Sequence, residues 1–407
     1  MSRKAVLTLQ LLFLILITVA ISQGQKYLNK PSSSSKTLLA PTDKRIKAEG
    51  TLNIYDSDRA FPGVTLIASV GTAETFLIDM NANILQSWPV DSERARLLPN
   101  GNLLVISGTK WGSKRAPWKK IKNNIREYSW NGEIVWKYIA DDVLHHDLHR
   151  LDNGNTLLLK RSFVPESLYT KLESTTWQKS RIRSDTAFEI SPDGKIIWQW
   201  NTYDHIDLNN CGKRSCAALE LDEDKHVDWT HTNSISYLPE NIWFDQGDSR
   251  FKPGNLLILP RNLWSIFIAD KQSGKIVWTY HGNYRGGLSG GHEANMIDKG
   301  LPGAGNILVI DNGTSNHKGE SFILEISPPD QSLTWVYDKG HSFYTKTRGS
   351  VQRLANGNTL ISEDLTGRIF EVTPSKEIVW EYKIPFESNR SQRYPYNYCP
   401  GCVAKPN

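Results

Sequence analysis

Two polar side chains stand close together in the stretch Asp228-Trp-Thr-His-Thr-Asn-Ser234. His231 and Asn233 are two residues apart, so a β-strand would point both of them to the same face. An imidazole can serve as an acid, a base, a nucleophile or a metal ligand, and a neighbouring amide can donate or accept a hydrogen bond. The chemistry of this pair depends on which other groups the fold brings beside it.

A repeated pattern supplies the elements that must hold this pair. A turn, a pair of aliphatic residues and a tryptophan recur six times, ending at Trp88, Trp136, Trp198, Trp278, Trp335 and Trp380. Between these copies, Asn-Gly or Gly-Asn lies beside short apolar runs, at 98–105, 151–158, 253–258, 305–309 and 354–361. Asn-Gly between apolar strands is a strong hairpin signal. Short strands repeated in this way predict an all-β fold, a six-bladed β-propeller with four strands in each blade.

The repeat also predicts the order of the strands within each blade. The strand before each hairpin turn is expected to be innermost, and the tryptophan strand outermost. The first copy, at 65–88, has no innermost strand before it. We therefore expect the tail at 389–398 to supply that strand and to close the ring, which removes the exposed sheet edges.

Aligning the repeats on the apolar residue before each turn reveals a column of variable residues five positions upstream. The column contains Glu93, His146, Asn233, His292 and Gly349. Innermost strands line the channel of a propeller, so the polar members and His231 are expected to meet at one mouth. A second column, six residues after each hairpin asparagine, contains Arg161, Arg261, Asn312 and Asp364, with Arg261 on the blade of His231.

Each of these histidines also has an ordinary structural interpretation. A histidine at a strand end is usually a hydrogen-bonded surface residue, and histidines at repeat positions can be remnants of the repeat itself. Glu93 and Gly349 show that the fold does not require histidine at this position. The variation favours a functional cluster.

Three histidines can bind a metal, but the surroundings of this cluster favour an anion. Asp147 and Glu293 follow two of the histidines, yet no carboxylate accompanies every copy, and Arg261 would repel a cation. A guanidinium with imidazoles and an amide suits the oxygens of a sulfate or phosphate group, and one imidazole can act as a nucleophile. We therefore expect no metal and no cofactor at this site.

Several motifs, taken in order, resemble the bacterial arylsulfate sulfotransferase family from about residue 64 to residue 398. They are His145–Gly154, Asp228–Ser234, Leu259–Arg261, Gly291-His-Glu-Ala294, Val309–Gly313 and Arg393–Tyr398. The resemblance implies a six-bladed propeller that moves a sulfuryl group from an aryl sulfate to a phenol by a ping-pong mechanism. It also implies that neither a nucleotide sulfate donor nor a metal is needed.

The resemblance assigns roles to five residues. His292 corresponds to the nucleophile that forms a transient sulfohistidine, and the residues that hold the sulfuryl oxygens and transfer protons correspond to His146, His231, Asn233 and Arg261. Glu293 stands where the family usually has aspartate. The column alignment selects His146 rather than His145, and a slip of one residue would reverse that choice. Aromatic candidates for holding an aryl ring are Trp229, Trp243, Trp264 and Tyr284.

The rest of the chain divides into segments around this domain. Residues 1–24, with Arg3 and Lys4 before an apolar run, predict a signal peptide or membrane-anchor helix, and hence an extracytoplasmic location, periplasmic or secreted. A polar linker is expected at 25–50, the propeller sulfotransferase domain at 51–398 and a tail with a CxxC motif at 399–407. The insertion at 201–227 is either a lid over the channel or a surface loop.

Cysteines and charge limit the other interpretations. The four cysteines, as Cys211/Cys216 and Cys399/Cys402, predict two short-range disulfides in an oxidising compartment, with a zinc site as the alternative. A net charge of +5 with mixed signs argues against nucleic acid as a partner. A membrane-anchored, non-catalytic propeller that binds an anionic ligand is the alternative function. Propellers that bind pyrroloquinoline quinone usually have eight blades, so six copies disfavour that cofactor.

Overall fold

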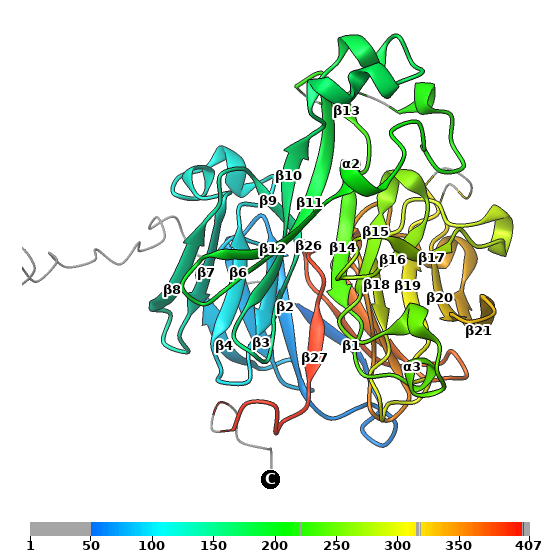
Figure 1. Ribbon diagram of the computed structural model, residues 1–407. Coiled ribbons are helices and arrows are strands. Elements are labelled where there is room, and N and C mark those ends of the chain that lie inside the picture. Colours follow the sequence, from blue (N-terminus) through cyan, green and yellow to red (C-terminus); the bar gives the residue numbers. More distant parts are fainter. Residues whose placement is uncertain are drawn as a thin grey trace, which may run out of the picture. The chain divides into compact units, whose positions relative to one another are not determined.

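The computed structural model describes residues 50–219, 221–222, 224–314, 317, 319–400 and 402. The expected signal or anchor segment at 1–24 and nearly all of the linker lie outside these residues. No helix in the described part of the chain is long and apolar enough to cross a membrane. The described residues form an all-β propeller of six antiparallel blades around one channel, as the repeat predicts (Figure 1).

Blades 2 to 6 follow one another along the chain, each with its innermost strand first. Blade 2 contains β5 (Ser92–Leu97), β6 (Leu103–Ser107), β7 (Asn124–Tyr128) and β8 (Ile134–Ile139). Blade 3 contains β9 (Leu144–Arg150), β10 (Thr156–Phe163), β11 (Ile182–Ile190) and β12 (Ile196–Asn201), with β13 (Val227–Asp228) parallel to β11. Blade 4 contains β14 (Thr232–Tyr237), β15 (Leu256–Pro260), β16 (Ile266–Ala269) and β17 (Ile276–Tyr280). Blade 5 contains β18 (Glu293–Met296), β19 (Ile307–Asp311), β20 (Phe322–Ser327) and β21 (Ser332–Asp338).

The two remaining blades contain the two ends of the domain. Blade 1 contains β2 (Val64–Val70), β3 (Glu74–Ile78) and β4 (Ile84–Trp88), and its innermost position is filled by β26 (Glu387–Ser388) and β27 (Gln392–Tyr394). Figure 1 shows these two red strands beside the blue β2. The expectation that the C-terminal tail closes the ring is therefore confirmed.

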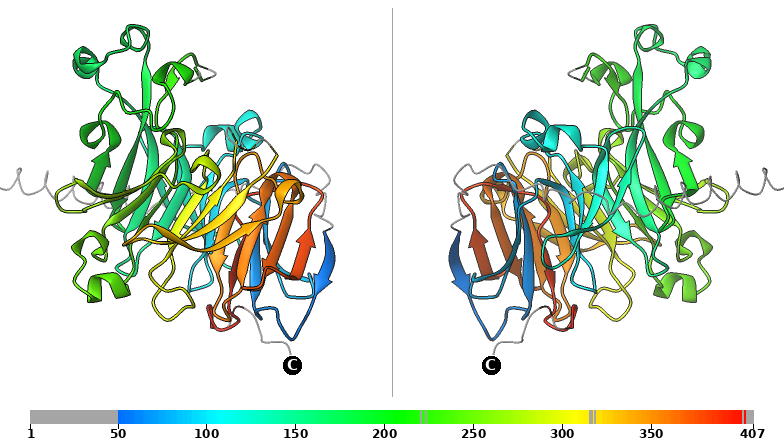
Figure 2. Two further views of the ribbon diagram at one scale, coloured as in Figure 1. Left: turned by 90° about the vertical axis from the view of Figure 1, so that its right-hand side faces the viewer. Right: turned by 90° about the vertical axis from the view of Figure 1, so that its left-hand side faces the viewer.

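Blade 6 departs from the expected strand order. It contains β22 (Ser350–Arg353), β23 (Thr359–Glu363), β24 (Arg368–Val372) and β25 (Ile378–Lys383), and a fifth strand, β1 (Thr51–Tyr55), pairs outside β25. The blue strand lies at the outer edge of the orange-red blade in Figure 2. The prediction that the tryptophan strand is outermost is thus wrong for this blade, because β1 lies outside the repeat and has none of its sequence signals.

Short helices occupy the connections. They are η1 (Gly112–Lys114), η2 (Trp118–Lys120), η3 (Glu166–Lys171), η4 (Trp177–Lys179), α2 (Thr202–His205), η5 (Cys216–Ala218), α3 (Ile242–Asp245), η6 (Ser249–Phe251), η7 (Arg261–Leu263), η8 (Tyr284–Gly286), η9 (Gly340–Ser342) and η10 (Asp364–Thr366). The segment with η3 and η4 projects beyond the strands of blade 3 (Figure 2).

Six hydrophobic clusters hold the ring together, one between each pair of adjacent blades. The cluster between blades 2 and 3, for example, packs Ile106 and Ile125 against Leu158 and Phe188. The cluster between blades 3 and 4 also includes residues of the insertion, among them Leu208. Because each core lies between two sheets, no blade buries its apolar faces alone.

The six repeat tryptophans tie each blade to the next. Each indole N–H donates to a backbone oxygen in the turn between the middle strand and the tryptophan strand that follows it in the next blade. The pairs are Trp88 to Ser129 (3.0 Å), Trp136 to Pro192 (2.8 Å), Trp198 to Lys271 (3.1 Å), Trp278 to Pro328 (2.8 Å), Trp335 to Pro374 (2.9 Å) and Trp380 to Met80 (3.0 Å). This closed circle of hydrogen bonds explains why the repeat contains tryptophan rather than another aromatic residue.

Replacing Trp278 with Phe is expected to lower the free energy of unfolding by about 1–3 kcal/mol. Phenylalanine keeps an aromatic side chain in the core, but the backbone oxygen of Pro328 loses its hydrogen-bond donor at a buried position. Urea denaturation measures the change. Trp136→Phe is the matched control, because its bond to Pro192 is exposed and water can replace the donor. Equal losses in the two variants would contradict the role of the buried hydrogen bond.

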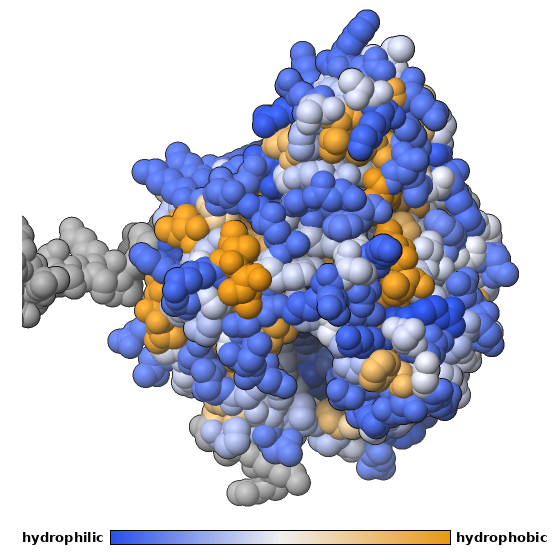
Figure 3. Space-filling view, viewed as in Figure 1, coloured by the Kyte–Doolittle hydropathy of each residue, from blue (hydrophilic) through white to orange (hydrophobic). Residues whose placement is uncertain are grey.

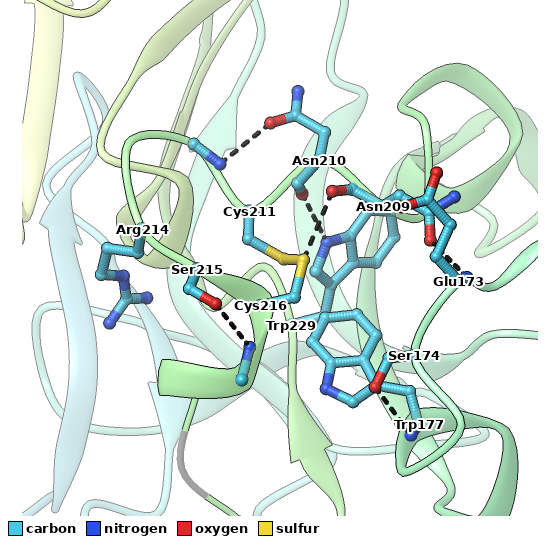
Figure 4. Close-up of a disulfide and its surroundings, with 12 residues drawn as sticks. Glu173, Ser174, Trp177, Asn209, Asn210, Cys211, Arg214, Ser215, Cys216 and Trp229 are labelled. Atoms are coloured by element: carbon cyan, nitrogen blue, oxygen red, sulfur yellow. Dashed lines mark hydrogen bonds between the residues drawn. A yellow bond between two sulfur atoms is a disulfide. The ribbon is translucent and has the colours of Figure 1, made fainter.

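Both cysteine pairs form disulfides, Cys211–Cys216 and Cys399–Cys402, so the zinc alternative is wrong. Figure 4 shows the first disulfide beside Trp229, whose indole N–H donates to the backbone oxygen of Asn210 at 2.9 Å. The disulfide lies in the insertion and fixes it next to the core between blades 3 and 4.

Candidate active site

Irregular backbone marks the ends of the innermost strands at one mouth of the channel. The pairing register shifts between Ser92 and Arg94, around 145–147, and between Thr232 and Ser234. These β-bulges coincide with the column positions of blades 2, 3 and 4. His146 and His231 have positive φ angles, of 60° and 48°. Bulges re-aim side chains, and such backbone angles are uncommon outside glycine, so the fold accepts local strain at the cluster.

His292 has its Nδ1 atom fixed by Asn312. The Oδ1 atom of Asn312 lies 2.7 Å from Nδ1, and the backbone oxygen of Gly290 lies 3.1 Å from it. The amide nitrogen of Asn312 donates to the backbone oxygens of Thr345 (2.7 Å) and Arg348 (2.8 Å). Asn312 must therefore accept from His292, so Nδ1 carries the proton. The unprotonated nitrogen of neutral His292 is Nε2.

His231 links a carboxylate to a guanidinium. Its Nδ1 atom bonds Asp228, and its Nε2 atom lies 3.1 Å from Nη1 of Arg261. Arginine can only donate, so Nε2 accepts and Nδ1 donates to the carboxylate. Both ring nitrogens are occupied, and His231 holds the Arg261 fork in place.

His146 lies beside His231 and contacts His145. The rings of His146 and His231 are 5.3 Å apart, edge to face. The Nδ1 atoms of His145 and His146 are 2.8 Å apart. Adjacent residues on a regular strand point to opposite faces, and the bulge brings these two rings together. His145 is buried against Asp185, while His146 is partly exposed.

Asn233 and Arg390 complete the arrangement. The buried amide of Asn233 donates one hydrogen to the backbone oxygen of Gly291 at 2.9 Å. Arg390, from the closing segment between β26 and β27, donates from Nη2 to the backbone oxygen of Asn233 at 2.7 Å. Its Nη1 atom is buried and has no hydrogen-bond partner among the described residues. The sequence could not indicate Arg390, because the closing strand has no hairpin turn on which to align it.

Three imidazoles of the cluster, those of His292, His146 and His231, are kept neutral. Burial, then the charges of Arg261 and Arg390, hold the pKa of His292 well below its ordinary value. Burial, then His145 and His231, do the same for the pKa of His146. Burial also lowers the pKa of His231, although Asp228 opposes the shift. Each imidazole is therefore unprotonated near neutral pH and can accept a proton or attack an electrophile.

These lowered pKa values predict that acid destabilises the protein. The unfolded chain takes up protons near pH 6.5 at histidines that stay neutral in the folded state, so stability is full above that pH and falls below it. At about pH 5.5, His146 and His292, whose pKa values are lowered furthest, each cost up to about 1.4 kcal/mol. Urea midpoints at about pH 7.5 and 5.5 measure the fall, and His146→Gln should reduce it. A protein that is more stable at the lower pH would contradict neutral burial.

The opposite mouth of the channel contains a cavity. It has a volume of about 960 Å³ and its lining includes Arg96, His149 and Tyr394, but none of the five predicted site residues. Figure 3 shows a hollow on this face, near β27. Fully buried Arg94 lies between the mouths and bonds Asp147 (3.2 Å) and Glu293 (3.0 Å). These carboxylates, which follow two of the site histidines, are thus engaged by arginine.

The insertion reaches the loops that hold Arg261 and lead to His292. Lys213 donates to the backbone oxygens of Gly282 (3.0 Å) and Gly286 (3.2 Å). Arg214 donates to the backbone oxygen of Asn262 at 2.7 Å, next to Arg261. The insertion therefore braces two blades beside the site.

The four aromatic candidates separate by position. Trp229 is fully buried in a blade core, and Trp243 belongs to α3, at the hairpin end of blade 4. Tyr284 donates its hydroxyl to Asp338 at 2.7 Å. Trp264 is partly exposed, directly follows η7 and has Arg214 over its ring at 5.2 Å. Trp264 is thus the candidate next to Arg261.

Fold and site together define a six-bladed propeller with an imidazole–guanidinium cluster at one channel mouth. The family model described as Arylsulfotransferase (ASST) matches residues 124–385. The match spans more than half of the chain, and the chain belongs to the arylsulfotransferase family.

Other comparisons concern the fold alone. No curated protein matches the sequence. A solved protein of unknown function from Bacteroides caccae is similar at 10% identity and a TM-score of 0.51, over 82% of this chain and 99% of that chain. A virginiamycin B lyase from Staphylococcus aureus aligns at 11% identity and a TM-score of 0.42, over 85% of this chain and 89% of that chain.

Proposed function

We propose that this arylsulfotransferase moves a sulfuryl group from an aryl sulfate to a phenol through a sulfohistidine at His292, without a nucleotide sulfate donor. The observation that carries the proposal is the Asn312–His292 hydrogen bond, which leaves Nε2 as the unprotonated nitrogen. In the first half-reaction Nε2 attacks sulfur and the phenolic oxygen leaves. In the second, an acceptor phenol attacks the sulfohistidine and His292 is regenerated.

Asn312 also supports the charge that develops on the nucleophile. As Nε2 bonds sulfur, the imidazole ring becomes positive and its Nδ1–H becomes a stronger donor. The oxygens of Asn312 and Gly290 already lie at 2.7 and 3.1 Å to accept it. This preorganised acceptance favours attack without any movement of the site.

The cations of the cluster suit the sulfuryl oxygens. Sulfuryl transfer resembles phosphoryl transfer, with negative charge spread over three equatorial oxygens in a loose transition state. His231 holds the fork of Arg261, and Arg390 lies close enough to lower the pKa of His292. The second hydrogen of the Asn233 amide adds a neutral donor. Trp264, beside Arg261, is the side chain we assign to the aryl ring.

A two-part experiment tests the proposal. The protein is mixed with p-nitrophenyl sulfate, and nitrophenol is followed with and without phenol. Without phenol, we expect a single burst of about one nitrophenol per protein molecule. With phenol present, we expect nitrophenol release to continue. Mass spectrometry of the quenched protein should find one SO₃ group on His292. Intact, folded protein that turns over no aryl sulfate would instead favour the non-catalytic propeller that binds an anionic ligand.

We further propose that the enzyme acts outside the cytoplasm, as a periplasmic or secreted protein. The two disulfides support this location, because such bonds persist in oxidising compartments. Residues 1–24 would then be a signal peptide or a membrane anchor. Fractionation of cells that express the full chain tests the location, and recovery in the cytoplasm would contradict the proposal. N-terminal sequencing of the recovered protein distinguishes a cleaved signal peptide from a retained anchor.

A further inference from the structure

Three groups form a row behind the channel mouth, and His146 is its outer end. The Nδ1 atoms of His146 and His145 are 2.8 Å apart, and Nε2 of His145 lies 3.2 Å from Oδ1 of Asp185. His145 is 5% exposed and Asp185 1% exposed. The two atoms face each other at this distance, and neither has a hydrogen-bond partner within the described residues. The row therefore opens to solvent only through His146.

The two histidines at the mouth are not equivalent as proton carriers. Both nitrogens of His231 are occupied, by Asp228 and by Arg261. Only Nδ1 of His146 is occupied, and in the described part of the chain its Nε2 atom makes no hydrogen bond. A residue that gives a proton to substrate needs a nitrogen that can reach it. His146 meets this requirement and His231 does not.

We propose that Asp185, His145 and His146 form a proton relay, in which Nε2 of His146 exchanges the proton with the phenolic oxygen. His145 and Asp185 are positioning residues that hold this proton between the two half-reactions. The inference rests on the proposed sulfuryl transfer and identifies which histidine serves it.

The proton balance closes over one catalytic cycle. The relay assigns both N–H groups of the free enzyme's His145 by geometry, because Nδ1 faces Nδ1 of His146 and Nε2 faces Asp185. It assigns to His146 a proton on Nε2. When His292 attacks sulfur and the S–O bond breaks, the leaving phenolate takes the Nε2 proton of His146. As that proton leaves, His145 passes its Nδ1 proton to Nδ1 of His146, so His146 stays neutral throughout. The acceptor phenol later returns a proton to Nε2 of His146, the N–S bond breaks with its electron pair returning to His292, and the relay shifts back.

The surroundings favour holding the proton at the inner end. Asp185 also accepts hydrogen bonds from the hydroxyl of Thr230 (2.6 Å) and the backbone N–H of Thr232 (2.7 Å), which fix the carboxylate. Although burial opposes it, the contact with His145 lowers the pKa of Asp185. His146 instead faces His231, His292 and Arg390, so a proton is disfavoured there.

Glu93 is another titratable group near His145, and its contribution must be separated from that of the relay. Burial raises the pKa of Glu93, although Arg348 and Arg390 oppose the shift. A carboxyl group of this kind can also donate a proton to a leaving group. The Glu93→Gln variant is therefore measured beside the relay variants.

The test is the dependence of the burst rate on the leaving group. Aryl sulfates are compared from p-nitrophenyl sulfate, with an acidic phenol, to phenyl sulfate, whose phenol has a pKa of about 10. His145→Gln and Asp185→Asn should change the rate with p-nitrophenyl sulfate by less than about threefold. Both should slow phenyl sulfate by about 10²-fold, at the lower end of what a general acid contributes.

Asp228→Asn is the matched control, since it also removes one carboxylate behind a histidine. It weakens the hold on Arg261, so it should slow every donor by the same factor. The relay would be overturned if His145→Gln slowed the burst with every aryl sulfate by the same factor. It would also be overturned if only Glu93→Gln made the burst rate depend on the leaving group. Wild-type protein that forms no sulfohistidine with any donor would instead reject the proposed function itself.

Discussion

Replacing His292 with Gly is expected to abolish aryl sulfate turnover, with a loss of at least about 10⁴-fold in kcat/KM, because the nucleophile is removed. No SO₃ group should appear on the protein after incubation with p-nitrophenyl sulfate. The buried site loses its imidazole but keeps Asn312, Arg261 and Arg390.

Free imidazole distinguishes loss of the nucleophile from loss of the fold. Added to His292→Gly, imidazole can occupy the vacated space, accept the sulfuryl group and restore nitrophenol release. His205→Gln is the matched control. His205 lies in α2, stacks on Trp200 and is outside the cluster. Its activity should equal that of wild type. Full activity in His292→Gly without imidazole would mean that another group attacks sulfur.

Replacing Arg261 with Lys is expected to lower kcat/KM by about 10²–10³-fold although the charge is kept. Lysine lacks the planar fork that spans two oxygens, and removal of one preorganised donor costs an enzyme about this much. His231, which bonds Arg261 at 3.1 Å, also loses its partner. Steady-state kinetics with p-nitrophenyl sulfate and phenol measure the loss.

The comparison of burst and steady-state rates shows where Arg261 acts. The sulfuryl group is transferred in both half-reactions, so Arg261→Lys should slow each of them. Arg250→Lys is a suitable control, since Arg250 forms a surface ion pair with Asp248 at 2.6 Å in the loop after α3. A variant of Arg261 that raises KM but keeps kcat would indicate ground-state binding only.

The fold was predictable because two local signals recur, a tryptophan strand in all six blades and an inner hairpin turn in five of them. Asn-Gly turns locate the inner hairpins, and each repeat tryptophan fixes an outer strand whose indole bonds the next blade. The tail at 389–398 followed from a missing strand in the first repeat. Strand β1 has neither signal, since its position depends on pairing with β25 at the other end of the domain.

The closeness of His146, His231 and Arg261 was predictable, but neither Arg390 nor the bonds within the cluster were. The column alignment brought His146 and His231 to one mouth, and the second column contained Asn312. Which nitrogen of His292 is unprotonated depends on hydrogen bonds that Asn312 makes to Thr345 and Arg348, far along the chain. The contact between His145 and His146 depends on a bulge, which no sequence pattern here indicates.

The pairing between the two ends of the domain determines when, during synthesis of the chain, the ring can close. Strand β2 is among the first to be synthesised, yet its inner neighbours β26 and β27 are among the last. Until they arrive, β2 presents an open edge, the kind of surface on which unfinished chains aggregate. The same late segment contains Arg390, which reaches Asn233 at 2.7 Å. Synthesis must therefore pass residue 390 before the site can have its second cation, so the candidate site is complete only after the closing strands have paired with β2.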